Sequence, residues 1–374
     1  MNKQNRILFI DYLRGLAVIV MIEVHVVNAF LKPEIRNNWW FEIINYINGL
    51  VAPTFLFITG FAFIIALEKK WNDYLQYNDI LFKQIKKIFQ ILIIGYALHL
   101  PYFSFHRFFF EMNESAYLNF LKVDVLHCIA FSLMFLLFLV LVLKNKNYLF
   151  YASLFFLLLI IFLTPIIWNI SFKNFSTPIA MYFNSQQGSM FPIFPWASFI
   201  FSGVVVAFLY LHFQSDKKIF NKMILYSLIV IAITIIVKFI PFSFYTNLNY
   251  YRTSPNFFFQ RIAIVIFLLG FLGTLETKNK LKNSFVNLVG SESLLVYSIH
   301  LLIIYGMFFD KKSISFIFGK TQNFLTTILL SISLIFFMTI VTYFWNFIKK
   351  KKLIYRRIIQ YSTLTIGLLF FFTH

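Results

Sequence analysis

Eleven long apolar stretches divide the chain, and they constrain its fold more than any other feature of the sequence. A helix needs about 20 apolar residues to cross the hydrocarbon core of a bilayer, and backbone groups in that core must be hydrogen-bonded within their own segment. We therefore predict an all-α fold, a polytopic transmembrane helical bundle of about 11 helices (10–11), forming a single domain over residues 1–374. The predicted helices span roughly 8–30, 48–67, 84–104, 125–143, 148–167, 193–213, 222–240, 258–275, 286–309, 324–347 and 354–372.

The composition excludes a water-soluble protein. The chain is 60% hydrophobic and only 13% charged, whereas about 25% of the residues of a soluble domain are charged. The formal net charge of +19 falls in short clusters between the apolar stretches, which is typical of loops that set membrane topology and not of a nucleic-acid-binding surface. The single cysteine, Cys128, excludes an intrachain disulfide and a cysteine-based metal site.

The distribution of basic residues predicts the orientation in the membrane. With the N-terminus placed in the cytoplasm, 21 of the 33 Lys and Arg residues fall in cytoplasmic segments and 11 in outer segments or outer helix ends. This bias favours a cytoplasmic N-terminus and an outer C-terminus. The first apolar stretch has no small-residue cleavage site after it, so we expect it to remain as the first helix of a bacterial inner-membrane (plasma-membrane) protein.

Ionisable residues inside the first predicted helix are candidates for a functional site. A central charge costs roughly 2.5–3.5 kcal/mol on membrane-insertion scales, so such residues are rarely incidental. Asp11 and Arg14 are three residues apart, and Arg14 and His25 are three helical turns apart, so all three share one face. Glu23 projects to another side. Two plainer interpretations stay open: a structural ion pair between Asp11 and Arg14, and a hydrogen-bonded packing role for His25.

The segment 290–306, "GSESLLVYSIHLLIIYG", is the second polar-bearing helix. At about 1.5 Å per residue, His25 lies roughly 26 Å above the start of its helix and His300 roughly 21 Å above the start of its own. The two histidines are therefore expected at similar depth, in the outer half of the membrane.

Other polar and small residues complete the set of candidates. Asp124 and His127 stand at the start of the predicted helix 125–143, where Asp124 is either a helix cap or a site carboxylate. Thr59 and Gly60, in the stretch 53–63, are expected to allow close helix packing. The sequence has no phosphate-binding glycine loop, G-x-S-x-G elbow or HExxH motif. We expect no metal site.

Several segments together resemble the transmembrane acyltransferase superfamily, in the branch of the heparan-α-glucosaminide N-acetyltransferase catalytic domain and its bacterial relatives. The opening "RILFIDYLRGLAVIVMIEVH" at 6–25 resembles the first helix of that branch. Further similarity lies in "APTFLFITGFAF" at 52–63, "VDVLHCIAFSL" at 123–133, "FPIFPWASFIFSG" at 191–203 and "GSESLLVYSIH" at 290–300, in the family's order. The position of His127 is more often Gln in relatives. The resemblance is strongest over 6–306.

The resemblance implies an acyltransferase that takes an acyl group, expected to be acetyl, from acetyl-CoA in the cytoplasm. The acceptor, often a sugar or glycan, is expected on the opposite face. By this resemblance His25 is the expected catalytic base and Arg14 supports the donor site. The animal enzymes use a histidine in the loop after the first helix, but this chain has none between Leu31 and Ile47. A heparan-type acceptor therefore does not follow.

The sequence also suggests a mechanism and an alternative. The cytoplasmic lysines Lys83, Lys86 and Lys87 are expected to attract the phosphates of the acyl-CoA, while His300 or Asp124 orients the base or the acceptor. Besides the lipid bilayer, the donor and a glycan or small-molecule acceptor, a homodimer is possible. Proton-coupled transporters and flippases also use intramembrane ionisable residues, but most are built from internal repeats, which this chain lacks. A non-catalytic scaffold would have little reason to keep so many buried ionisable groups.

Overall fold

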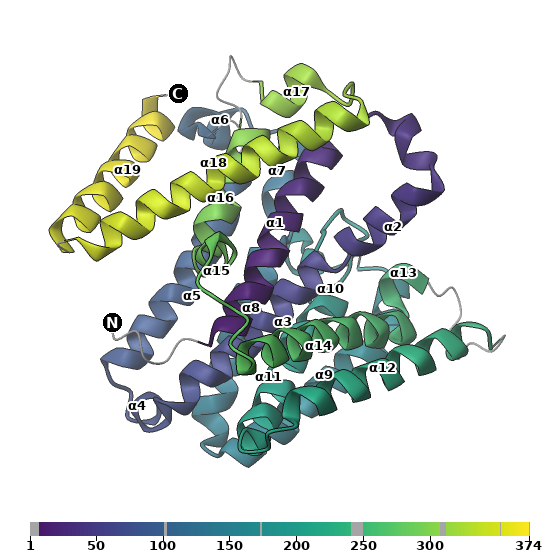
Figure 1. Ribbon diagram of the computed structural model, residues 1–374. Coiled ribbons are helices and arrows are strands. Elements are labelled where there is room, and N and C mark those ends of the chain that lie inside the picture. Colours follow the sequence, from purple (N-terminus) through teal and green to yellow (C-terminus); the bar gives the residue numbers. More distant parts are fainter. Residues whose placement is uncertain are drawn as a thin grey trace. The chain divides into compact units, whose positions relative to one another are not determined.

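The computed structural model describes residues 7–100, 103–172, 174–240, 250–306, 312–351 and 353–373. Within these ranges the regular elements are helices, and Leu31 forms an isolated parallel β-bridge with Gln322. The all-α prediction is confirmed, and each of the eleven predicted helices has a helical counterpart in the structure (Figure 1).

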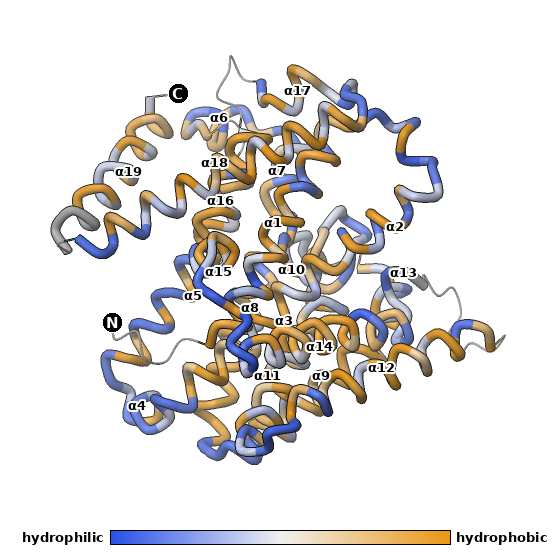
Figure 2. Tube along the Cα trace, in the orientation of Figure 1, coloured by the Kyte–Doolittle hydropathy of each residue, from blue (hydrophilic) through white to orange (hydrophobic). Residues whose placement is uncertain are grey.

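Eight of the described helical segments are long and apolar enough to cross a membrane, and a ninth is added if one bent pair of helices counts as a single span. The protein is therefore an integral, multi-pass membrane protein. Two of the eleven predicted helices do not meet the criterion. One is α5 (Asp79–Leu98), whose first half carries Asp79, Lys83, Lys86 and Lys87. The other is α19 (Leu353–Thr373), whose apolar part is shorter, at Tyr361–Thr373. Figure 2 shows the contrast between the hydrophobic long helices and the hydrophilic region of α4 and early α5.

The chain forms two compact units, each assembled from three separate stretches of sequence. Unit 1 comprises Met1–Ile10, Ala52–Tyr96 and Leu121–Leu281. Its helices are α3 (Val51–Glu68), α4 (Trp71–Leu75), α5, α8 (Val125–Leu143), α9 (Lys146–Asn169), α10 (Thr177–Phe183), α11 (Ile193–Phe213), α12 (Ile219–Lys238), α13 (Tyr250–Thr253) and α14 (Pro255–Thr277). The single domain predicted over the whole chain stays a prediction.

Two glycines bring helices of unit 1 into backbone contact. A Cβ atom at Gly60 of α3 would lie 1.9 Å from the carbonyl oxygen of Ile200, and one at Gly203 of α11 would lie 1.9 Å from that of Phe57. Side chains larger than hydrogen are therefore excluded at both positions, and α3 and α11 approach as closely as small residues permit in membrane helices. The close packing predicted for the stretch 53–63 is confirmed.

The first turn of α1 (Leu8–Phe30) is held by an acidic side chain from α14. The backbone N–H groups of Leu8 and Phe9 donate to the two carboxylate oxygens of Glu276, at 3.2 and 2.7 Å. The first N–H groups of a helix have no partner inside it, and a negative charge there is favourable. Glu276 thus fixes where α1 begins, and the ring of Phe9 packs on Phe61 and Phe220.

Unit 2 comprises Asp11–Val51, Ala97–Phe120 and Lys282–His374. It contains most of α1, and its other helices are the 3-10 turn η2 (Pro33–Asn37), α2 (Trp39–Asn48), α6 (Phe105–Phe110), α7 (Glu114–Leu121), α15 (Phe285–Ser291), α16 (Ser293–Tyr305), α17 (Ile314–Phe318), α18 (Phe324–Lys350) and α19.

A second pair of glycines lets α1 cross α15 in unit 2. A Cβ atom at Gly15 would lie 2.0 Å from the carbonyl oxygen of Val286, and one at Gly290 would lie 2.1 Å from that of Asp11. The two backbones therefore touch at this point. Gly15, which follows Arg14, and Gly290, which opens the "GSES" segment, therefore both lie where α1 crosses α15.

The predicted helix 286–309 is broken in the structure. Helices α15 and α16 meet at an angle of 86°, and Glu292 stands between them with non-helical backbone angles. Its carboxylate forms an ion pair with Lys349 of α18, at 2.7 Å. The polar residues at this point therefore mark a break in the span, where the continuous apolar run had suggested a straight helix.

Candidate active site

His25 of α1 and His300 of α16 lie side by side in unit 2. Their ring centroids are 5.1 Å apart and their planes are tilted by 53°. His300 is fully buried, whereas His25 is half-buried. The structure therefore brings together the two histidines that were expected at similar depth, with His25 the more accessible of the two.

The hydrogen bond of His300 defines which of its ring nitrogens carries a proton. Nδ1 lies 2.6 Å from the carbonyl oxygen of Val296. A carbonyl oxygen only accepts, so Nδ1 is the donor and, in the neutral ring, Nε2 keeps its lone pair. Nε2 is buried and has no hydrogen-bond partner within the described part of the chain. His300 therefore presents an acceptor atom inside unit 2.

Two tyrosines contact the histidine pair and an arginine lies near one of them, and none of the three was predicted from the sequence. The Tyr305 hydroxyl donates to the backbone carbonyl of His25 at 3.3 Å, and the Tyr297 ring lies 5.9 Å from that of His300. Arg36 donates to the carbonyl of Val27 at 2.8 Å and lies close enough to Tyr305 to interact electrostatically with it. Spacing on α16 could have indicated Tyr297, one turn before His300, but nothing in the sequence places Arg36 here.

Asp11 and Arg14 lie at the glycine crossing of α1 and α15. An Arg14 guanidinium nitrogen is 3.9 Å from a carboxylate oxygen of Asp11, so the two form a long ion pair on the predicted face. The Asp11 residue is buried and Arg14 is half-buried. On another side of the helix, the Glu23 carboxylate accepts a hydrogen bond from the Asn48 amide of α2.

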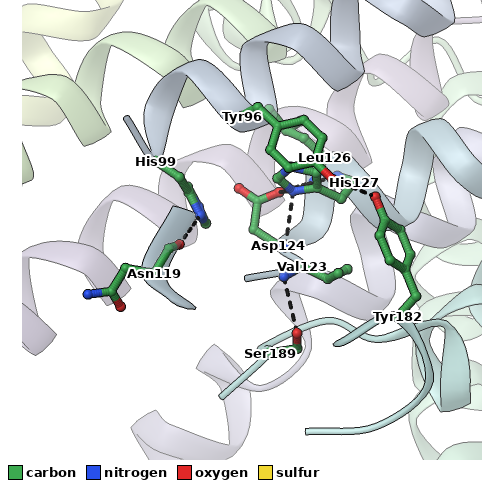
Figure 3. A network of polar contacts seen from close by, with 9 residues as sticks. All are labelled: Tyr96, His99, Asn119, Val123, Asp124, Leu126, His127, Tyr182 and Ser189. Atoms are coloured by element: carbon green, nitrogen blue, oxygen red, sulfur yellow. Dashed lines mark hydrogen bonds and ion pairs between the residues drawn. The ribbon is translucent and has the colours of Figure 1, made fainter. Parts of the chain in front are cut away.

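Asp124 and His127 form a separate polar cluster in unit 1 (Figure 3). Asp124 caps α8, because its Oδ1 accepts from the backbone N–H groups of Leu126 and His127 at 2.8 and 3.2 Å. The His127 ring is fully buried, with Nδ1 at 2.9 Å from the same carboxylate oxygen. The contacts of Asp124 match the capping interpretation that the sequence left open.

Tyrosines extend this cluster across unit 1. The Tyr96 ring of α5 packs edge-on against His127, with 4.2 Å between centroids, and its hydroxyl is hydrogen-bonded to that of Tyr182 at 3.2 Å (Figure 3). Burial, aided by the hydrogen bond with Tyr96, raises the pKa of Tyr182. Tyr182 is therefore a neutral phenol at any physiological pH. Gly95 allows the contact, because a Cβ atom there would lie 3.0 Å from the His127 ring.

The three predicted donor-binding lysines line one hollow of unit 1. Lys83, Lys86 and Lys87 of α5 and Lys70 beside α4 surround a space of ≈ 290 Å³. Lys83 forms a loose i,i+4 ion pair with Asp79, at 4.0 Å. Clustered positive charge around a hollow attracts anions such as phosphates. Among the residues that the structure describes, no group of three or more His, Cys, Asp or Glu side chains is placed to hold a metal ion.

The apolar spans and the histidine pair define a multi-pass membrane protein with ionisable groups inside its helices. The family described as "Heparan-alpha-glucosaminide N-acetyltransferase, catalytic" matches residues 6–237, which is more than half of the chain. The protein belongs to this family of membrane acetyltransferases. No curated protein sequence matches the chain. The matched range contains His25, Arg14 and the lysines of α5 and ends before His300, so the family likeness of the segment 290–300 stays a prediction.

Proposed function

We propose that this protein moves an acetyl group from acetyl-CoA, supplied from the cytoplasm, to a hydroxyl or amine of a sugar or glycan on the opposite face of a bacterial inner membrane. The observation that carries the proposal is the pairing of His25 with His300 in a chain of this acetyltransferase family. Imidazole is the side chain best suited to take a proton near neutral pH.

The lysines of α5 are proposed to bind the donor. Acetyl-CoA carries several phosphates, and Lys70, Lys83, Lys86 and Lys87 offer four ammonium groups around one hollow. The predicted orientation places this hollow on the cytoplasmic side, where the donor is made. The attraction is electrostatic and therefore weakens as salt concentration rises.

His25 is proposed to act as the general base. Its neutral imidazole takes the proton from the acceptor hydroxyl or amine while that oxygen or nitrogen forms a bond to the thioester carbonyl carbon. The carbon–sulfur bond then breaks, the electron pair leaves on sulfur, and the proton held by His25 passes to the thiolate. General base catalysis of this kind contributes typically 10²–10⁴-fold. His25 suits the role better than His300 because it is the more exposed residue of the two.

The remaining predicted residues are proposed to act around His25. His300 orients the base or the acceptor through Nε2, while Arg14 supports the donor side of the site and Asp11 holds the Arg14 side chain. Tyr305 fixes the backbone of His25 through its carbonyl. A part for Asp124 in orienting the acceptor stays a proposal, and its capping contacts favour a structural role.

The test is the binding and turnover of acetyl-CoA labelled in the acetyl group, by detergent-purified full-length protein and by the His25→Ala variant. We expect both to bind the donor and only the wild type to consume it. His106→Ala is the matched control, because His106 is exposed and pairs with Glu111. Turnover by His25→Ala at the wild-type rate would reject the role of His25. Absence of binding by either protein, with substrate flux in vesicles, would favour a transporter.

A further inference from the structure

Arg36, in the turn η2 that follows α1, is half-buried and has only neutral hydrogen-bond partners. Its Nη2 atom donates to the backbone carbonyl of Val27 at 2.8 Å, and Nη1 donates to the amide oxygen of Asn28 at 3.2 Å. Among the described residues, no Asp or Glu forms an ion pair with Arg36, and its Nε atom is buried without a partner. A guanidinium offers five N–H donors, and a partly buried charge without a counter-charge costs free energy. An anionic ligand would offset this cost.

The position of Arg36 relates it to the proposed general base. Asn28, which holds its guanidinium, follows His25 by three residues, so the two side chains lie on one face of α1, one turn apart. Tyr305 donates to the backbone carbonyl of His25 at 3.3 Å and also lies close enough to Arg36 to interact electrostatically with it. An anionic group bound by Arg36 would therefore lie about one helical turn from His25, a distance that a single sugar ring can bridge.

Helix α2, which begins three residues after Arg36, has two apolar faces. One face packs against the end of α1 in a cluster that comprises Val27, Leu31, Ile35, Trp40, Phe41 and Ile44. The opposite face presents an exposed stripe of three large side chains at four-residue spacing, Trp39, Ile43 and Ile47. The apolar segment that α2 opens, Trp39–Glu68, is long and apolar enough to cross a membrane. The stripe therefore faces hydrocarbon chains, and its first residue lies close in sequence to the charge of Arg36.

We propose that the acceptor is a sugar phosphate carried on a lipid, with its phosphate bound by Arg36 and its hydrocarbon chain lying along the exposed stripe of α2. This inference rests on the proposed function, because it places the sugar beside His25. Arginine offers planar paired donors that match phosphate oxygens. A neutral glycan would leave the charge of Arg36 unmatched, and a water-soluble sugar phosphate would make no use of the stripe. A phosphate joined to a hydrocarbon chain matches both features.

The first experiment follows labelled acetyl groups in membrane vesicles from cells that express the full chain. Vesicles are incubated with acetyl-labelled acetyl-CoA and extracted with chloroform and methanol, and vesicles with His25→Ala give the label incorporated by other enzymes. We expect label in the organic phase, released into water by mild acid, which hydrolyses glycosyl phosphates. Arg36→Gln should lower this label roughly tenfold, since a charge-assisted contact is lost, and Arg36→Lys should retain part of it. Label in a water-soluble product alone would overturn the proposal and leave the proposed function standing, whereas no label above the His25→Ala level would count against the proposed function.

Binding is measured independently of turnover, on the full chain purified in detergent. The probes are farnesyl phosphate, which combines a phosphate with a hydrocarbon chain, and farnesol, which lacks the phosphate. We expect the wild type to bind farnesyl phosphate roughly tenfold more tightly than farnesol, and Arg36→Gln to bind the two equally. Arg107→Gln is the matched control, because Arg107 pairs with Glu111. Equal binding of both probes by the wild type would overturn the proposal.

The part of the stripe is tested with the double variant Trp39→Ser/Ile43→Ser, which should weaken the binding of both probes. The control is Phe336→Ser/Phe344→Ser on α18, whose side chains are similarly exposed. Equal weakening by the two double variants would remove the stripe from the proposal. Phosphatidylglycerol that binds as tightly as farnesyl phosphate would identify a site for any anionic membrane lipid and would also overturn the proposal. If Arg36→Gln does not fold, Arg36→Lys and the stripe variant decide the same question.

Discussion

The two histidine clusters of this protein differ in what their polar atoms do. In unit 1, the ring of His127 and the carboxylate of Asp124 are used by the helix that carries them, since they close the N-terminus of α8 in a capping box. In unit 2, the ring of His25 packs against that of His300, and both residues lie inside their helices, away from the helix ends. The first cluster closes the end of a helix, while the second places two imidazole rings against each other.

This difference distinguishes polar side chains that stabilise the fold from polar side chains that are available for catalysis. A buried polar group that caps a helix removes an unsatisfied backbone donor and so contributes to folding. The rings of His25 and His300 lie inside α1 and α16, so a capping role does not explain them. Both clusters consist of a histidine near a second ionisable residue, so residue type alone does not distinguish them. The capping contacts of Asp124 and His127 do.

The largest expected effect comes from removing the two histidines separately. We expect His25→Ala to lower the turnover of acetyl-CoA by about 10²–10⁴-fold, because the general base is lost, while the melting temperature in detergent changes little. We expect His127→Ala to do the reverse: it destabilises the protein by about 1–3 kcal/mol through the lost cap and buried contacts, with the specific activity of the folded protein retained. Activity and thermal unfolding, measured on the same preparations, check both.

Either of two results would contradict the assignment of a structural role to His127 and a catalytic role to His25. If His127→Ala abolished turnover in protein that is still folded, the Asp124–His127 cluster would be part of the active site. If His25→Ala unfolded the protein, His25 would be a packing residue, which is the plainer alternative that the sequence allows.

The next effect concerns the glycine crossing that brings α1 against α15. We expect Gly15→Ala to destabilise the protein by roughly 1–3 kcal/mol, because its Cβ atom would lie 2.0 Å from a backbone oxygen that cannot easily move. Because Asp11 and Arg14 lie at the same crossing, the specific activity should fall as well. Gly367→Ala in α19 is the control, since nothing lies within 4 Å of that position. Equal melting temperatures for the two variants would contradict the close crossing.

Much of the fold could be predicted from the sequence because the membrane imposes a simple rule on helix length. Each of the eleven apolar stretches has a helical counterpart among the described residues, and Gly60 indicated a close helix contact that the structure contains. His25 and His300 do lie side by side, but the count along a straight helix from residue 286 does not explain it, because that helix is broken at Glu292 by 86°. The predictions of helices and of close helix packing depend on length and periodicity, which are local properties.

The features that could not be predicted depend on contacts between distant parts of the chain. The break at Glu292 is accompanied by an ion pair with Lys349, 57 residues further on. The first turn of α1 is held by Glu276, which lies 268 residues from Leu8. Arg36 approaches Tyr305 only through the fold. An apolar run indicates that a helix forms, but the residue that ends or caps that helix is set by tertiary packing.

A smaller effect is expected from replacing the lysines of α5. This experiment tests whether donor binding depends on unit 1 and proton transfer on unit 2. We expect the triple variant Lys83→Gln/Lys86→Gln/Lys87→Gln to raise the KM for acetyl-CoA by about tenfold with kcat nearly unchanged. The lysines are proposed to bind the donor equally well in the ground state and the transition state, and the general base is still present in the variant. The same substitutions at the exposed residues Lys217, Lys278 and Lys280 serve as the control. A fall in kcat at unchanged KM would place the lysines outside donor binding. Raising the salt concentration should reduce the difference between wild type and variant.

The smallest expected effect separates the two roles of Asp124. We expect Asp124→Ala to cost about 1 kcal/mol of stability, a typical value for a lost N-cap, whereas Asp124→Asn should cost less because its amide oxygen still accepts from the backbone N–H groups of Leu126 and His127. The specific activity of both folded variants should remain near that of the wild type. A site carboxylate behaves differently, since the loss of its charge in Asp124→Asn would reduce turnover even where the cap is preserved. Turnover of Asp124→Asn is therefore the decisive measurement, and a reduction of tenfold or more at an unchanged melting temperature would move Asp124 from the cap of α8 into the active site.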